Sequence, residues 1–409
     1  MIEIKIPDVV KGVLNTQFGN GNLGGDFRNS VSFPLSWSKV KGAKSYAVTL
    51  IDYESTNTLG AIFVHWVATN IKTNKLKWDE SFAKKDKLFQ FENSVTDKAS
   101  AYMLQSFYQS HPNGVYFGPF PPDCDHNYRL EVFALDINDI LENSPFDPKQ
   151  PLFYDQFLEL IKNHVVDWGV TSFLYRTRSK MEEGRIIPLE ITENQLNLPL
   201  SEEQSKFFVS FDKINFYSNA LQARSNNYHL LDIKYLGKEA SSLIYGAQNF
   251  DLEIYSESQN IKEYVILVTS FAETSSLGVG LVCWVKVGIK KTNDSYKTII
   301  LAGNNPFEKS DDLVQIQNTF AGPSAETIAS IIGKNVTDFD LIDHSYGLLF
   351  LPGLTNGQGN YSLEIFGINQ EIDWANIEKT KGQKLNATDV LQTIKGKIVA
   401  YNRTFFKLV

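Results

Sequence analysis

The sequence predicts a mainly β protein built from two similar domains, and three observations lead to this prediction. The chain of 409 residues is longer than the roughly 100 to 200 residues of a typical domain. Aromatic residues make up 13% of it, and Phe and Tyr pack well on the pleated surface of a sheet. Two stretches of the chain also align with each other, which indicates that one domain occurs twice. We therefore expect two antiparallel β-sandwiches with a few peripheral helices.

The internal repeat consists of two blocks. The first aligns Lys44 with Lys262, an offset of 218 residues, and pairs KSYAVTLIDYESTNTLGAIFVHWVATNIK with KEYVILVTSFAETSSLGVGLVCWVKVGIK. The second aligns Gly114 with Gly347, an offset of 233 residues, and pairs GVYFGPFPPDCDHNYRLEVF with GLLFLPGLTNGQGNYSLEIF. One insertion of 15 residues, the difference between 233 and 218, reconciles the two offsets. Because Gly, Trp and Asn-Tyr keep their order and register, duplication is favoured over chance patterning.

The repeat defines a first domain at 1–180, a linker at 181–205 that is rich in acidic and turn-forming residues, and a second domain at 206–409. Alternating or apolar runs predict strands at 46–52, 63–71, 128–136, 264–271, 281–289, 298–303 and 361–368. Apolar residues at spacings of three and four predict one helix near the end of each copy, at 152–166 and 387–400. A final strand follows each helix.

Composition argues against several classes of protein. The net charge of −8 disfavours nucleic acid as a partner. No apolar run reaches the roughly 18 to 20 residues of a transmembrane segment. The first residues lack the pattern of a secretion signal, so we expect a cytoplasmic protein. The two cysteines, Cys124 and Cys283, lie in different halves of the chain and have no metal-type spacing. We therefore expect no disulfide, no metal and no cofactor.

The first copy carries a series of short motifs in a fixed order. These are PLSWS at 34–38, a strand that ends at Asp52, HWV at 65–67, GPFPP at 118–122, HNY at 126–128, and a final helix and strand with His164 and Tyr175. With this order and spacing, 1–180 resembles the phosphatidylethanolamine-binding (Raf kinase inhibitor-like) protein family, bacterial branch. The resemblance implies a two-sheet antiparallel sandwich with a small pocket for phosphate-like or carboxylate-like groups at one end.

The resemblance also implies which residues form this pocket: Asp52, Glu54, His65, Gly118, Pro121, Pro122, His126, Tyr128 and Tyr175. Histidine and tyrosine offer N–H and O–H donors to an anion, Asp52 can fix the tautomer of an imidazole, and the prolines stiffen the rim. A single histidine in an apolar strand, such as His65, is more often a core residue. Its occurrence with His126 and Tyr128 in family order favours the pocket.

Two positions depart from the family pattern. Around Asp52 and Glu54, the prolines that bracket two aspartates in most members are missing. Asn127 stands where an arginine is usual, and Arg129 points to the same face of the strand by alternation. We therefore expect weaker anion binding than the family norm.

The second copy keeps the packing residues and loses the pocket. Across the repeat, the pocket positions become Ser270, Ala272, Cys283, Leu351, Leu354, Thr355, Gly359 and Tyr361. Tyr361 retains the chemistry of Tyr128, and Trp284, Leu363 and Phe366 retain the core. We expect the second domain to support the first or to form a surface for a protein partner or for self-association.

Three functions follow from these patterns. The first is a non-enzymatic protein whose first domain binds a small phosphorylated or carboxylated ligand. The alternative is a structural or assembly protein whose domains only present interaction surfaces, which the missing prolines and the lost second pocket favour. Hydrolysis by a His–Asp pair ranks last, because no nucleophile elbow or metal constellation accompanies the pair. We therefore predict that the protein is not an enzyme.

Overall fold

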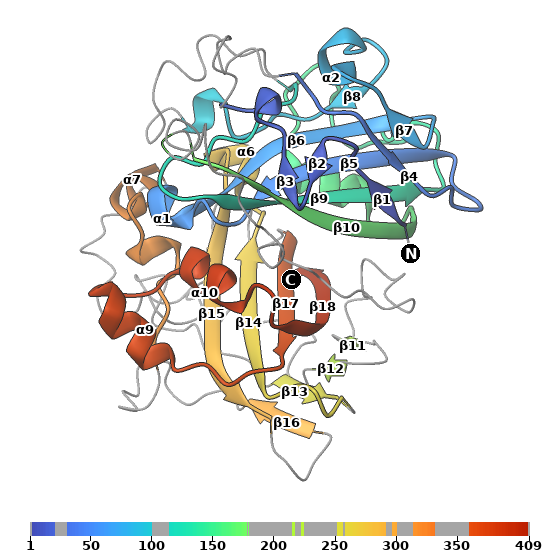
Figure 1. The fold of residues 1–409 in the computed structure, drawn as a ribbon. Coiled ribbons are helices and arrows are strands. Elements are labelled where there is room, and N and C mark those ends of the chain that lie inside the picture. Colours follow the sequence, from blue (N-terminus) through green and yellow to red (C-terminus); the bar gives the residue numbers. More distant parts are fainter. Residues whose placement is uncertain are drawn as a thin grey trace, which may run out of the picture. The chain divides into compact units, whose positions relative to one another are not determined.

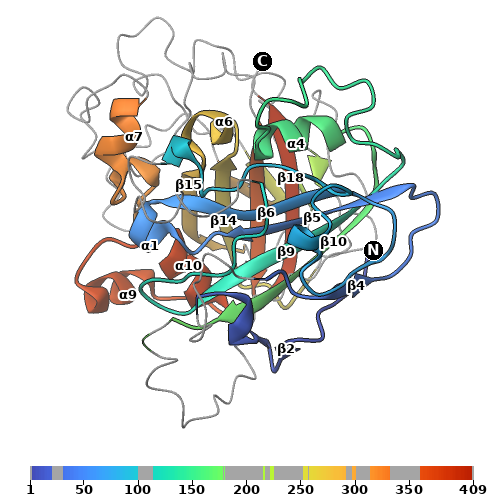
Figure 2. The same cartoon turned by 90° about the horizontal axis from the view of Figure 1, so that it is seen from above.

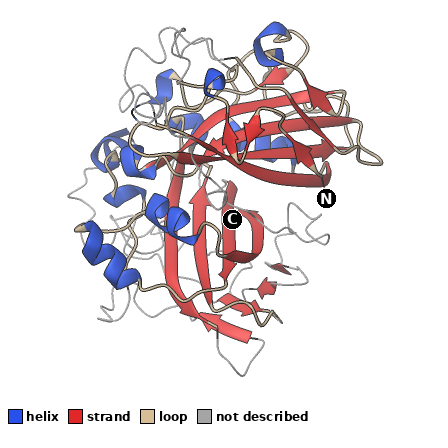
Figure 3. Ribbon diagram, viewed as in Figure 1, coloured by secondary structure: helices blue, strands red, loops and turns tan. Residues whose placement is uncertain are grey.

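The structure is a computed structural model. It describes residues 2–20, 31–99, 114–177, 179, 215–216, 222–224, 252–256, 258–291, 297–300, 314–331 and 360–407. The chain divides into two compact units. Unit 1 comprises Met1–Thr58, Ile62–Asn197 and Thr274–Val279, and unit 2 comprises Leu59–Ala61, Leu198–Glu273 and Gly280–Val409. Strands predominate in the described part of both units (Figure 3), so the prediction of a mainly β fold with few helices is confirmed.

The main sheet of unit 1 is built on four long antiparallel strands (Figure 1). In spatial order these are β6 (Ala61–Ile71), β5 (Ser45–Asp52), β9 (His126–Leu135) and β10 (Val165–Tyr175). The short strands β3 (Val13–Leu14) and β2 (Val9–Val10) follow β10, and β8 (Phe89–Gln90) pairs with β6. A second, small sheet contains β1 (Ile4–Lys5), β4 (Leu35–Trp37) and β7 (Lys75–Leu76).

The central strands β5 and β9 are buried along their whole length, because each is paired on both sides and covered on both faces. On one face, Leu50 and Leu130 join a core cluster with Leu35 and Trp37 of the small sheet. On the other face, the ring of Phe133 lies 5.8 Å from that of Phe157 in α4 (Tyr154–Ile161; Figure 2). Alternate residues of these strands thus pack into two hydrophobic layers, one against the small sheet and one against α4.

Helix α4 is shorter than the helix predicted at 152–166. It begins after Phe153, whose backbone N–H donates to Gln156 Oε1 (2.8 Å), and it ends at Ile161. The β-branched Val165 is already the first residue of β10 and pairs with Leu135 of β9. The last residues of the predicted helix therefore belong to the sheet. The other short helices in the described part of unit 1 are α1 (Thr56–Leu59), α2 (Glu80–Ala83), η1 (Thr16–Phe18) and η3 (Asp97–Ala99), and α6 (Thr274–Leu277) groups with this unit.

Unit 2 has its own antiparallel strands in the order β15 (Gly280–Lys290), β14 (Glu263–Ser270), β17 (Asn360–Ile368) and β18 (Ile398–Lys407). A separate sheet contains β11 (Asn215–Phe216), β12 (Gln222–Arg224), β13 (Leu252–Tyr255) and β16 (Lys297–Ile300). Its described helices are α7 (Ala325–Ile331), α9 (Trp374–Lys381), α10 (Ala387–Ile394) and η5 (Thr319–Ala321). Helix α10, like α4, is shorter than its predicted range of 387–400 because a strand starts at Ile398.

The strand pairings of the two units correspond at the offsets found in the sequence. Asp52 lies opposite Tyr128 in unit 1, and Ser270 lies opposite Tyr361 in unit 2. The register between β5 and β6 shifts at Leu50/Ile51, and that between β14 and β15 shifts at Val268/Thr269. Helix α4 corresponds residue for residue with α10. The predicted linker at 181–205 lies outside the described residues, and no helix within the described ranges is long and apolar enough to cross a bilayer.

The core of unit 1 gives a stability prediction. Leu130→Ala should lower the free energy of unfolding by about 2 to 5 kcal/mol, because Leu130 is fully buried in the central strand and the change leaves a cavity. Val10→Ala, at a position that is 67% exposed, is the control and should change it by less than about 0.5 kcal/mol. Amide hydrogen exchange of β5 and β9 under urea measures both, and equal protection in the two variants would contradict this description of the core.

Candidate ligand-binding site

Four of the residues singled out in the sequence come together at one end of the main sheet of unit 1. Asp52 ends β5 opposite Tyr128 of β9, and His126 begins β9 two residues earlier, on the same face as Tyr128. The ring of His65, from β6, lies 5.1 Å from that of Tyr128, and the ring of His126 lies 6.4 Å from it. All four side chains are buried. Their role in binding a ligand stays a prediction.

His126 is held between two carboxylates. Its Nδ1 donates to Asp52 Oδ2 (2.8 Å) and its Nε2 donates to Asp123 Oδ1 (2.9 Å). Because carboxylates only accept, both ring nitrogens carry protons and the ring is an imidazolium. Burial disfavours this charge, but the charge of Asp52 and the hydrogen bonds to both carboxylates outweigh it and raise the pKa of His126 well above its usual value. Burial likewise opposes the charge of Asp123, but the bond to His126 prevails and lowers the pKa of Asp123 to about 2.

His65 is in the opposite state. Its Nδ1 lies 3.0 Å from the backbone oxygen of Phe117, which can only accept, so Nδ1 carries the proton. Burial lowers the pKa of His65 to about 4 although Asp52 attracts the charged form. At neutral pH, therefore, Nε2 of His65 is an acceptor, and it becomes a donor only when the ring takes up a second proton. In the neutral ring the Nδ1–H already donates to Phe117, and the expected role of His65 as a donor to an anion stays a prediction.

The two tyrosines take different parts. Tyr128 accepts a hydrogen bond from the backbone N–H of Phe120 (3.1 Å). Burial, with Asp52 nearby, raises the pKa of Tyr128 well above its usual value, so it remains a phenol with a proton to donate. Tyr175 donates its hydroxyl proton to the backbone oxygen of Thr16 (2.6 Å). Its ring packs against Tyr128 at 6.4 Å, so Tyr175 supports the wall of the cluster.

Glu54 belongs to a neighbouring contact. Its carboxylate accepts hydrogen bonds from the backbone N–H and the Nδ2 of Asn127, both at 3.2 Å. Strand alternation places the Asn127 side chain on the face away from His126 and Tyr128. The backbone N–H of Glu54 also donates to Asp52 Oδ1 (2.7 Å), which fixes the orientation of the Asp52 carboxylate toward His126. Glu54 thus positions the cluster from outside it.

The loop before β9 forms the rim. Gly118 follows Phe117, whose backbone oxygen accepts the hydrogen bond from Nδ1 of His65. Pro121 is buried and Pro122 is exposed. Asp123 is a member of the cluster that was not predicted from the sequence, and its second oxygen accepts from Asn57 Nδ2 (3.0 Å). The available signal was an acidic residue three positions before a candidate histidine in the same loop.

In unit 2 the corresponding positions hold little of this chemistry. Ser270 takes the place of Asp52 and donates to Glu273 in its own turn. Cys283 takes the place of His65, and burial, with Glu273 nearby, raises the pKa of its thiol well above the usual value. Ala272 and Tyr361 are buried. The remaining predicted equivalents lie outside the described residues: Leu351, Leu354, Thr355 and Gly359.

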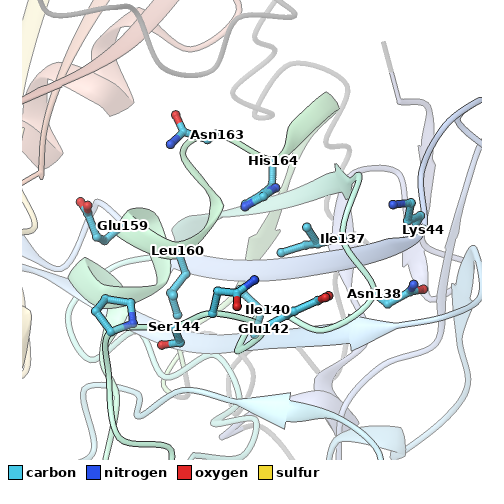
Figure 4. Close-up of a pocket in the computed structure, with 12 residues that line it drawn as sticks. Lys44, Ile137, Asn138, Ile140, Glu142, Ser144, Glu159, Leu160, Asn163 and His164 are labelled. Atoms are coloured by element: carbon cyan, nitrogen blue, oxygen red, sulfur yellow. The ribbon is translucent and has the colours of Figure 1, made fainter.

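A separate pocket of about 440 Å³ lies at the opposite end of the unit 1 sheet (Figure 4). It is lined by residues before β5 and after β9, among them Lys44 and His164, with Glu159 and Lys44 at opposite sides in this view. His164 Nδ1 donates to Asp136 Oδ1 (2.8 Å). The eight residues of β5 separate this pocket from Asp52 by roughly 25 Å at about 3.3 Å per residue. His164 therefore does not belong to the His126 cluster.

The described part of unit 1 is thus a mainly antiparallel β domain with a buried Asp–His–Tyr cluster at the end of its sheet, and comparisons with known proteins indicate its family. A family model described as phosphatidylethanolamine-binding protein matches residues 8–176. The uncharacterized protein YxkA of Bacillus subtilis is 32% identical over 142 residues, which are 33% of this chain and 76% of YxkA. The chain belongs to the phosphatidylethanolamine-binding protein family.

Two solved structures are also similar. Escherichia coli YbcL, described as a new member of the mammalian family, has 21% identity and a TM-score of 0.33, covering 43% of this chain and 98% of its own. A putative phosphatidylethanolamine-binding protein homologue from Chlamydia trachomatis, CT736, has 18% identity and a TM-score of 0.30, covering 42% and 95%.

The opposite charge states of the two histidines can be measured. In an NMR titration, the His65 ring should stay neutral down to about pH 5 with its proton on Nδ1, while His126 should stay charged well above its usual pKa. Because His65 binds a proton more readily unfolded than folded, stability should fall as the pH drops from about 6.5 to about 4. His65→Asn should reduce this acid sensitivity. Titration of His65 near pH 6.5 would contradict its burial as a neutral ring.

Proposed function

We propose that unit 1 is a non-enzymatic binding domain for a small phosphate or carboxylate group, and that unit 2 supports it or forms a protein-interaction surface. One observation carries the proposal. The buried imidazolium of His126 already holds a carboxylate oxygen of Asp123 at Nε2, 2.9 Å away, next to Tyr128 and His65. This is the geometry by which a charged donor holds an anion.

A ligand would take the place that Asp123 occupies. The Asp123 side chain is 27% exposed and can turn toward solvent, which frees the Nε2–H of His126. The Tyr128 hydroxyl and a protonated His65 supply further donors. Because the ligand competes with a tethered carboxylate, binding is weaker than to an open pocket, as expected from the departures of the sequence from the family pattern.

The same contacts argue against hydrolysis. A general base needs a free lone pair on its nitrogen, and both nitrogens of His126 carry protons that point at carboxylates. His65 keeps a lone pair on Nε2, but burial lowers the pKa of His65 to about 4, so it is a weak base at neutral pH. We also propose that the protein works in the cytoplasm, where the thiols of Cys124 and Cys283 would stay reduced.

We further propose that unit 2 arose by tandem duplication of the same domain. Matching strand order, matching strand register and matching positions of the register shifts between β5–β6 and β14–β15 support this proposal. Helices α4 and α10 add to it, since each has eight residues at the offset of the second sequence block. With Ser270 and Cys283 in place of an acid and a histidine, the second copy lacks the donors of the first.

The alternative is a scaffold in which neither unit binds a ligand. The pairing of both His126 nitrogens with Asp52 and Asp123 favours the scaffold, because these bonds already hold the fold together without a ligand. Titration of anions into the protein separates the two functions.

The first test removes a donor. At about pH 4, where His65 can take up its second proton, His65→Ala should weaken binding of sulfate by about 1.5 to 3 kcal/mol, because it removes a hydrogen bond to a charged group. The affinity of the unmodified protein should also fall as the pH rises from about 4 to about 6, since only the protonated His65 has a donor at Nε2 and sulfate keeps its charge over this range. Isothermal titration calorimetry measures both, with Cys283→Ala in unit 2 as the unaffected control. If sulfate and phosphate bind at neither pH, the scaffold is the better account.

The second test removes the competing carboxylate. Asp123→Ala should strengthen sulfate binding by about 1.5 to 3 kcal/mol, because the ligand no longer displaces an internal charged hydrogen bond. The control is Asp147→Ala, which removes the same charge from an exposed turn elsewhere in unit 1. Equal gains in both variants would mean that net charge, and not the vacated donor, is responsible.

A further inference from the structure

Three metal-ligating side chains of different chemistry meet in the loop before β9. They are Asp123, Cys124 and His126, and their ligand atoms all lie within 4.8 Å of one another. Carboxylate oxygen, thiolate sulfur and imidazole nitrogen are the three ligand types of zinc sites. With zinc bonds of about 2.0 to 2.3 Å, tetrahedral ligand atoms lie roughly 3 to 4 Å apart, so shifts of about 1 Å suffice to close the site.

Two further residues orient these ligands. Asp52 accepts from Nδ1 of His126 (2.8 Å) and so leaves Nε2 directed at the cluster. Asn57 donates to Oδ2 of Asp123 (3.0 Å) and so leaves Oδ1 facing Nε2. A carboxylate behind the ligating histidine and a hydrogen bond behind the ligating carboxylate are the usual outer-shell partners of a protein-bound metal. His126 is fully buried whereas Asp123 is partly exposed, which gives an ion a path from solvent.

We propose that Asp123 Oδ1, Cys124 Sγ and His126 Nε2 form a binding site for Zn²⁺ or a similar thiophilic divalent cation. The ion would replace the proton that His126 Nε2 shares with Asp123 Oδ1 in their hydrogen bond. Nitrogen and sulfur ligands favour zinc over magnesium or calcium, which prefer sites made of oxygen alone. Three protein ligands leave a fourth position for water or an external anion.

This inference does not rest on the proposed anion binding, since the ion is held by protein atoms. It revises the expectation of no metal, which considered the spacing of the two cysteines. A single cysteine with an acid and a histidine inside four residues does not produce a cysteine-pair pattern. The structure reveals the cluster because it brings the Asp123 carboxylate and the His126 ring close to the Cys124 thiol.

The test uses the full chain without any anion ligand. Titration with Co²⁺, a spectroscopic substitute for Zn²⁺, should give one equivalent of bound metal with a thiolate-to-cobalt charge-transfer band in the near ultraviolet, and Zn²⁺ should abolish the band. Cys124→Ser should remove the band, and Asp123→Asn should weaken Zn²⁺ binding at least tenfold in a chelator competition. Asn57→Ala, behind the ligating carboxylate, should weaken it by about 10-fold or more.

Cys283→Ala is the matched control, because it removes the other thiol and should leave the band and the affinity unchanged. Far-ultraviolet circular dichroism checks that each variant is folded, and Cys124→Ser, in a partly exposed loop, preserves the strands. The proposal is overturned if folded protein gives no charge-transfer band, if the band persists in Cys124→Ser, or if Zn²⁺ affinity is the same in Asp123→Asn. A lost anion affinity with intact metal binding would instead count against the anion site.

Discussion

The buried ion pair between Asp52 and His126 is the interaction on which this end of unit 1 depends. It ties the end of β5 to the start of β9, and Asp123 on the other side of the ring ties in the loop before β9. Removing one partner of such a pair leaves an uncompensated buried charge, at a cost of about 3 to 5 kcal/mol. Asp52 is itself fixed by the backbone of Glu54, so the turn after β5 is part of the same arrangement.

The state of the neighbouring groups follows from this pair. The positive charge of His126 adds to burial in keeping His65 neutral, although Asp52 acts in the opposite direction. Asp52 also helps to keep Tyr128 protonated. A negative ligand or a divalent cation that entered the cluster would therefore change the electrostatic potential at both histidines. Either one would shift the protonation of His65 and His126 together.

The sequence predicted the β-rich fold and most long strands, because both the alternation of apolar and polar residues and the internal repeat can be recognised from residue types and their spacing. It also named Asp52, His65, His126 and Tyr128, which the fold brings together. It overextended the helix at 152–166, since sheet pairing of Val165 overrides helical spacing. The tautomer of His65 depends on the backbone of Phe117, which is distant in sequence and could not be inferred from spacing. The spacing of Asp123 from His126 was visible in the sequence, but the orientation of its carboxylate depends on the distant Asn57.

Because β5–β9 and β14–β17 have matching registers, a strand of one unit could pair with the wrong strand of the other during folding. With the same pattern of bonds, β5 can in principle complete the ladder of β17 as well as that of β9, and repeated domains are prone to such misassembly. On β17, Asp52 would face Tyr361, but the position two residues earlier is Gly359 and offers no imidazole. The wrong pairing would bury the Asp52 carboxylate without its histidine partner, so we expect this charge to disfavour pairing of β5 with β17.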